Sequence, residues 1–162
     1  MRYFLVFPIF ALLIAVLPCS GTIIEFSLDE MVRSSKLIVI GRVSRIAENP
    51  RAESIKETQS VEAIATIEIE EVILGSYEEK QIDIPYYPRL SVSAHFNISE
   101  RCILFISEWK GKNVIVQGYG GKIPIIEDEV IVRHILGEKK GQTLKDFIER
   151  IKDSKSRQGA IR

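Results

Sequence analysis

The segment VEAIATIEIEEVIL, residues 61–74, decides the fold class of this chain because its side chains alternate between apolar and polar. One face carries the apolar set and the other carries the polar set: Val61, Ala63, Ala65, Ile67 and Ile69 against Glu62, Thr66, Glu68 and Glu70. A period of two residues is that of a β-strand with one face in water. At Glu70-Glu71 the phase shifts, so that Val72 and Leu74 continue the apolar face, which predicts a β-bulge.

Further strand patterns lie on both sides of this segment. They cover residues 37–43, 81–87, 102–107, 114–117, 122–126 and 130–135. Gly41 inside the first of them predicts a bend or a bulge, and Pro85 predicts an edge strand because proline cannot donate to a sheet ladder. The polar segments 48–60 and 88–100 are expected to be loops, with a hairpin turn at residues 111–113.

A helix is expected near each end of this series of strands. Ser27 and Glu30 form a Ser-x-x-Glu capping box, which predicts a helix that ends at about Ser35. A second helix is expected from Thr143, with an apolar stripe at i, i+3, i+4 and i+7 that needs a packing surface. The polar residues after Lys152 are expected to fray. Several short strands between two helices predict a mainly β fold, a small closed or nearly closed barrel capped by helices.

The overall composition is that of one ordinary globular domain. The chain has 162 residues, 46% hydrophobic and 27% charged, with 22 basic and 22 acidic side chains. A net charge of zero argues against a general nucleic-acid binder, which needs a basic surplus to neutralise phosphates.

The N-terminus predicts export. Met1 and Arg2 precede an uncharged apolar run, residues 3–17, which is shorter than the roughly 20 residues of a membrane span. Pro18 and the small residues up to Gly21 then complete a signal peptide at residues 1–21, with cleavage after Gly21. The expected destination is the extracellular space, the periplasm or the cell envelope. A buried helix, a retained signal anchor and a lipoprotein tethered through Cys19 remain alternatives.

Under this interpretation residues 22–141 form the barrel with the first helix, and residues 142–162 form the C-terminal helix and polar tail. Cys102 lies in the apolar stretch CILFI and is expected to be a buried, inert thiol. It could form a disulfide with Cys19 only if cleavage leaves Cys19 in the mature chain.

The order of these elements resembles that of tissue inhibitors of metalloproteinases and netrin-type modules. The resemblance covers residues 27–126 and rests on the LIVIGRV, ATIEIEEVILG, QIDIPYY and ERCILFI strands, with Gly41, Gly75 and the Glu100-Arg101 strand entry as individual positions. It implies an OB-type barrel of five to six strands flanked by an N-terminal and a C-terminal helix.

The resemblance does not extend to the inhibitory motif. The inhibitors present an N-terminal cysteine, within Cys-x-Cys, whose amino group and carbonyl chelate the zinc of the protease. This chain has Cys19-Ser20-Gly21 instead, and a comparable N-terminus would require cleavage after Pro18. The fold is therefore expected to carry over without the inhibitory mechanism.

No combination of residues in the sequence predicts catalysis, a metal site or a cofactor. His95 and His134 have no metal-ligand spacing, and Ser91, Ser93 and His95 lack a nucleophile elbow and read as a solvated loop. Glu68 and Glu70 read as a charged solvent face rather than as an acid/base pair. The glycine-rich residues 118–121 lack the spacing of a phosphate loop and predict a tight turn.

The sequence therefore favours an exported, non-enzymatic binding module. OB-type barrels commonly bind ligands through exposed aromatic residues and loops, and the candidates here are Tyr87, Arg89, Trp109 and Tyr119, whereas Tyr86 is expected in the core. The expected partner is a protein or an extracellular polymer, not nucleic acid, with membrane contact only through the signal sequence or a lipid on Cys19. The alternative is an extracellular protease inhibitor that acts through an N-terminal Cys19.

Overall fold

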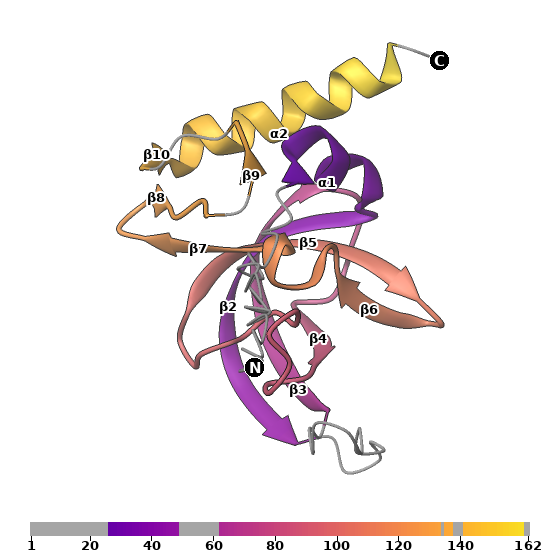
Figure 1. Ribbon diagram of the computed structural model, residues 1–162, viewed down its shortest axis with the longest axis vertical. Coiled ribbons are helices and arrows are strands. Elements are labelled where there is room, and N and C mark those ends of the chain that lie inside the picture. Colours follow the sequence, from indigo (N-terminus) through magenta and orange to yellow (C-terminus); the bar gives the residue numbers. More distant parts are fainter. Residues whose placement is uncertain (1–25, 49–61, 134, 138–140, 161–162) are drawn as a thin grey trace, which may run out of the picture.

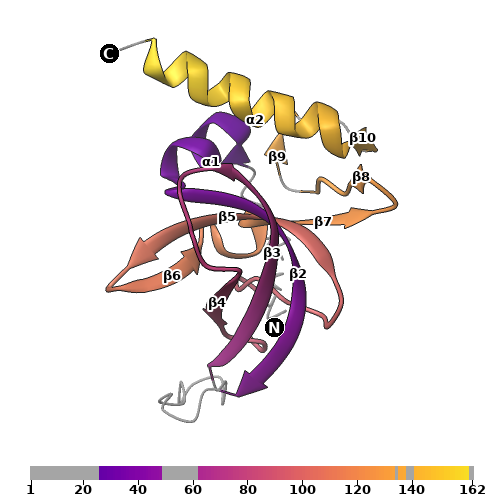
Figure 2. The same ribbon diagram turned by 180° about the vertical axis from the view of Figure 1, so that it is seen from behind.

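The computed structural model describes residues 26–48, 62–133, 135–137 and 141–160. In chain order the elements are β1 (Phe26–Ser27), α1 (Leu28–Ser34), β2 (Leu37–Glu48), β3 (Ala63–Leu74), β4 (Gln81–Tyr86), β5 (Arg101–Trp109), β6 (Lys112–Ile115), the 3-10 helix η1 (Gly118–Gly121), β7 (Lys122–Ile126), β8 (Glu129–Val130), β9 (Ile135–Leu136), β10 (Gln142–Thr143) and α2 (Leu144–Gly159). The two α-helices lie side by side at one end of the molecule, and the long strands β2 and β3 curve away from them (Figures 1 and 2).

The predicted fold class is confirmed as mainly β, an antiparallel sheet with two helices. The sheet order is β10-β8-β7-β5-β2-β3-β4, and β6 pairs with β5 beside this path. A separate parallel pair joins β1 to β9. Strand β4 pairs with β3 alone, as Pro85 predicts for an edge strand. No strand pairing within the described residues joins β4 to β6, so the sheet is not closed by hydrogen bonds.

The segment with the alternating pattern forms β3, and its predicted bulge is confirmed. Ile40 pairs with Glu71 and Gly41 pairs with Ile69, so Glu70 is the extra residue on β3. The carboxylate of Glu70 then accepts from Arg101 at 2.6 Å, which ties the bulge to β5. Gly41 is required opposite this site, because a Cβ there would lie 2.5 Å from Cγ2 of Ile67 and 2.8 Å from the carbonyl oxygen of Glu68.

Two apolar cores lie on opposite faces of the sheet. The helix-side core consists of buried residues from both helices and the outer sheet face: Leu28, Met31, Val32, Ile38, Ile40, Ile103, Phe105, Val116, Ile123, Ile125, Val130, Val132, Ile135, Phe147 and Ile151. The inner core fills the concave side: Leu37, Val39, Val43, Ala63, Ala65, Ile67, Ile82, Ile84, Tyr86, Ala94, Phe96, Cys102, Leu104 and Ile106. Strand β5 contributes alternate residues to each core, because successive side chains point to opposite faces.

The first helix begins as the sequence predicts. The Ser27 hydroxyl accepts from the backbone N–H of Glu30, and the Glu30 carboxylate accepts from the backbone N–H of Ser27, which completes the capping box. Its last turn ends at Ser34, one residue before the predicted end.

The second helix is longer than predicted. Thr143 caps its N-terminus, and the helix continues through the polar residues 153–159 instead of fraying after Lys152. The reason lies in α1: Ser154 is completely buried, Arg157 pairs with Asp29 at 2.9 Å, and the Gln158 side chain donates to the Asp29 carbonyl oxygen at 2.8 Å. Polar residues therefore hold the end of α2 against the first helix.

Two further expectations need correction. The hairpin turn between β5 and β6 lies at Lys110-Gly111, where both residues have positive φ, rather than at residues 111–113. Glu62 and Thr66, which were expected on the solvent-exposed face of β3, are buried. Glu62 pairs with Lys112, and Thr66 donates to Asp83 at 2.7 Å.

The predicted signal peptide and most of the loop at 48–60 lie outside the described residues. Among the residues that are described, neither α-helix is long and apolar enough to cross a membrane.

Candidate functional site

The short helix η1 is the point around which the candidate residues are arranged. The backbone N–H of Tyr119 donates to the carbonyl oxygen of Val92 at 3.2 Å, so η1 lies against the loop that follows β4. A Cβ at Gly118 would lie 2.0 Å from the same oxygen, and Gly118 has a φ of 56°. Only glycine permits this approach, which fixes η1 on the loop.

One hollow beside η1 contains Trp109, and we call it the Trp109 hollow. It is lined by Ser34, Ser107, Glu108, Trp109, Val114, Ile115, Val116 and Gln117 and has a volume of about 530 Å³. Trp109 is 61% exposed, and the Lys110 ammonium lies 4.3 Å from the centre of its ring. Val116, by contrast, belongs to the helix-side core. The Trp109 hollow therefore contains both a buried residue of the helix-side core and an exposed aromatic ring.

The other hollow contains Tyr119, and we call it the Tyr119 groove. Its volume is about 410 Å³, and it is lined by His95, Asn97, Glu100, Tyr119, Gly120, Lys122, Ile123, Pro124, Ile126, Ile131, Arg133 and Ile135. Lys122 donates to both oxygens of Glu100, at 2.6 and 2.7 Å, and both side chains of this ion pair are largely buried. Apolar side chains from β7 and the segment after β8 make up most of the remaining wall.

The four sequence candidates are thus only partly brought together. Tyr119 lies in η1 and Trp109 at the end of β5, and the two residues line separate hollows. Tyr87 is half-buried and Arg89 is exposed on the loop after β4, and neither lines the two hollows. Tyr86 is buried in the inner core, as predicted.

Two exposed apolar residues near these hollows were not among the candidates predicted from the sequence. Val92 is 66% exposed on the loop that η1 contacts, and Ile126 is 59% exposed at the end of β7. Both lie in segments whose hydrophobic pattern is typical of an ordinary loop or strand. Their exposure in the folded chain is therefore the only sign that they could contact a partner. Exposed large apolar side chains gathered near hollows are typical of interaction sites.

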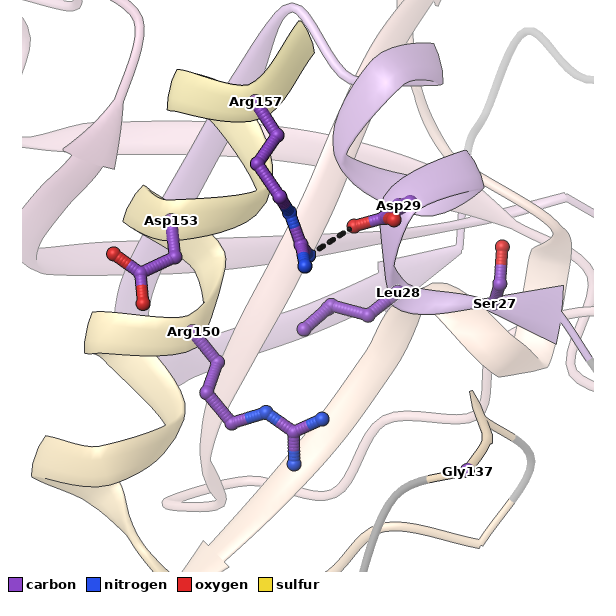
Figure 3. Close-up of a pocket in the computed structure, with 7 residues that line it drawn as sticks. All are labelled: Ser27, Leu28, Asp29, Gly137, Arg150, Asp153 and Arg157. Carbon is purple, nitrogen blue, oxygen red and sulfur yellow. Dashed lines mark hydrogen bonds and ion pairs between the residues drawn. The ribbon is translucent and has the colours of Figure 1, made fainter.

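A third hollow, between the two helices, was not anticipated either. It is lined by Ser27, Leu28, Asp29, Gly137, Arg150, Asp153 and Arg157. Figure 3 shows the Arg157 guanidinium pointing from α2 to Asp29, whereas Asp153 points away from α1.

One ion pair in this third hollow, between Asp29 and Arg157, joins the two helices. The Ser154 hydroxyl, then Arg157, hold the pKa of Asp29 below its usual value. The hollow therefore acts as a polar clamp between the helices.

The groups considered for covalent chemistry are separated or occupied. Cys102 is completely buried, and burial raises the pKa of its thiol to about 12, which fits the inert thiol predicted. The Ser93 hydroxyl accepts from the backbone N–H of Tyr87 at 3.0 Å, and His95 is exposed beside it in the sequence. Cys19 and His134 lie outside the described residues. The described part of the chain holds no group of three or more His, Cys, Asp or Glu side chains that could bind a metal ion.

Comparison with known proteins leaves the function to be argued from this geometry. No known family model matches the chain, and no curated protein matches it significantly.

Proposed function

We propose that this chain is an exported, non-enzymatic binding module with an OB-type barrel like that of netrin-type modules, and that it holds a protein or extracellular polymer through the Trp109 hollow. The observation that carries the proposal is the exposure of Trp109, which is 61% exposed beside the turn between β5 and β6 and lines a hollow that reaches Val116 of the helix-side core.

The path of the strands supports the barrel. Strand β4 runs antiparallel to β3, and β6 runs antiparallel to β5. Because β3 and β5 both run antiparallel to β2, strands β4 and β6 run parallel to each other, and their edges are in contact. Parallel pairing of the third and fifth strands is what would close a five-stranded barrel built from β2, β3, β4, β5 and β6. The Lys112 ammonium, on β6, lies 3.2 Å from the carboxylate of Glu62, the residue that precedes β3, so an ion pair also links these two parts of the path. A barrel so nearly closed would leave the loops and η1 to make contacts with a partner.

The chemistry of the Trp109 hollow supports recognition. Tryptophan is enriched among the residues that dominate binding energy, because its ring buries a large area at little cost in conformational entropy. The apolar floor at Val114 and Val116 can exclude water once a partner covers it. Ser107 and Gln117 offer hydrogen-bonding groups at the rim.

The arrangement of the polar groups supports binding rather than catalysis. A nucleophile needs a base within hydrogen-bond reach, and both are normally placed in a concave site. The thiol of Cys102 is buried in the inner core, away from both hollows, and the hydroxyl of Ser93 is occupied by a backbone donor.

The proposal is tested by capture of partners from the extracellular or envelope fraction of the source cells. The processed protein is immobilised beside Trp109→Ala and a matched control, Ile98→Ala, which removes a side chain that is 64% exposed outside both hollows. We expect partners retained by the wild type and by Ile98→Ala to be lost with Trp109→Ala. Equal retention by all three proteins would overturn the assignment of the surface.

Export is tested on the same material by the intact mass of the processed chain. We expect a mass that begins at Thr22 with one thiol open to alkylation after denaturation. A mass that includes Met1 would overturn export by signal peptidase. A mass that begins at Cys19 with added acyl chains would place the module on a membrane through that lipid.

A further inference from the structure

The Tyr119 groove has a chemistry of its own that the proposed partner surface does not use. We infer that it binds a small aliphatic carboxylate, with the hydrocarbon chain over Ile126 and Ile131 and the acid group at Arg133 and His95. This site goes beyond the proposed function, which places the partner in the Trp109 hollow.

The apolar part of the groove fits a hydrocarbon chain. Ile126 is 59% exposed, whereas Ile123 and Ile135 are buried and belong to the helix-side core. Pro124 and Ile131 are half-buried. Together these apolar side chains form a wall of the groove that extends from the buried core to the exposed surface. Covering these side chains with an alkyl chain would remove apolar surface from water, which is the main source of affinity in pockets of this kind.

The charged part of the groove favours an acid. Among the residues that the structure describes, Glu100 is the only carboxylate that lines it, and both of its oxygens accept from Lys122. One of them also accepts from the backbone N–H of Asn97 at 3.1 Å. Glu100 and Lys122 therefore cancel each other, and Glu100 has little capacity left to bind a cationic ligand.

Two further basic side chains line the groove. Arg133 is exposed, and it forms no ion pair with another residue that the structure describes. His95 is exposed on the opposite element, the loop before β5. A guanidinium presents a planar fork that matches a carboxylate in two hydrogen bonds, so Arg133 is the group that would select an acid.

The size of the groove selects a single chain. Its volume of about 410 Å³ lies at the small end of the range for pockets that hold small molecules. Its concave form suits one alkyl chain with one head group, rather than the flat surface of a bilayer.

The experiment compares three ligands of equal chain length: octanoate, octanol and octylamine. Each is titrated into the processed protein at neutral pH and followed by amide and isoleucine methyl NMR signals, which also locate the site. We expect octanoate to bind at least tenfold more tightly than octanol and octylamine to bind most weakly, with the largest shifts at Ile126 and Ile131.

Two variants on exposed positions separate the two parts of the site. Arg133→Gln should remove the preference for octanoate over octanol while leaving octanol binding unchanged, and Ile126→Ser should weaken both ligands by a similar factor. Arg45→Gln is the matched control, because it removes an exposed cation on β2 outside the groove. Its affinities should equal those of the wild type.

Four results would overturn the inference. They are the absence of octanoate binding, equal affinity for octanoate and octanol, tighter binding of octylamine, or binding of anionic lipid vesicles without octanoate binding. Shifts that depend on Trp109 instead of Ile126 would overturn the location. Because the capture experiment depends on Trp109, loss of the proposed function would leave the octanoate result standing, and the reverse also holds.

Discussion

The two cores on the faces of β5 are assembled in different ways. The inner core draws on β2, β3 and β4, which are consecutive in the chain and pair as antiparallel neighbours. The helix-side core instead brings α1, near the start of the described chain, against α2 at its end. A core built from sequential strands is encoded in local alternation, whereas a core built from distant helices depends on contacts that no local pattern contains.

The largest expected effects come from deleting one large side chain in each core. Phe147→Ala should lower the free energy of unfolding by about 3–5 kcal/mol, and Ile84→Ala should lower it by about 2–5 kcal/mol, because each side chain is fully buried. Since β5 belongs to both cores, each variant should still unfold in one transition. Urea unfolding followed by circular dichroism measures both quantities.

A separate early transition in Phe147→Ala would contradict this expectation. It would show that the helices form a unit that unfolds independently of the sheet.

A smaller effect is expected at the close approach of β2 to β3. Gly41→Ala should cost about 1–3 kcal/mol, because the added Cβ overlaps the Ile67 side chain and the Glu68 carbonyl oxygen. Gly159→Ala is the control, since nothing lies within 4 Å of a Cβ at that position. If both variants are equally stable in urea, the bulged strands adjust more readily than their spacing indicates.

The thiol of Cys102 tests how dry the inner core is. Its pKa is raised from 9.0 to about 12 in the folded chain, so the neutral thiol is stabilised on folding. This contribution is fully present below pH 9 and is lost as the pH rises towards 12. Between pH 8 and pH 10.5 the wild type should therefore lose more stability than Cys102→Ala, as measured by urea unfolding.

The same thiol should not react with Ellman's reagent in the native protein at pH 8 and should react after denaturation. Rapid reaction in the native state would show that the inner core opens.

The smallest effect is expected at the clamp between the helices. Asp29→Asn should cost no more than about 1 kcal/mol, because the Asp29–Arg157 pair is largely exposed. The pKa of Asp29 is lowered, so its contribution is present above the usual carboxyl range and is lost as the pH falls through the folded value. Asp153→Asn is the control, since that side chain points away from α1 (Figure 3). An equal acid dependence of both variants would exclude a specific role for Asp29.

The comparison of the cores also explains which features the sequence could predict. Alternation predicted β3 and its bulge at Glu70, and proline chemistry predicted that β4 lies at an edge. The polar end of α2 was expected to fray, because its stabilising partner, Asp29, lies far away in the chain. Burial of Glu62 under Lys112 was missed for the same reason.

Similar reasoning applies to the candidate site. Trp109 and Tyr119 could be named from the sequence because large aromatic residues next to loops are natural candidates. That they line two different hollows depends on how β5, β6 and η1 pack in the folded chain, which local sequence does not reveal. The exposure of Ile126 follows from its place at the end of β7, which hydrophobicity alone does not reveal.

The clamp between α1 and α2 also sets the order of events during synthesis. Asp29 and Arg157 are separated by 128 residues, so α1 leaves the ribosome long before its partner exists. A helix of seven residues is not stable alone in water. The chain therefore completes its helix layer only after α2 has emerged, and until then the apolar face of α1 is available to chaperones.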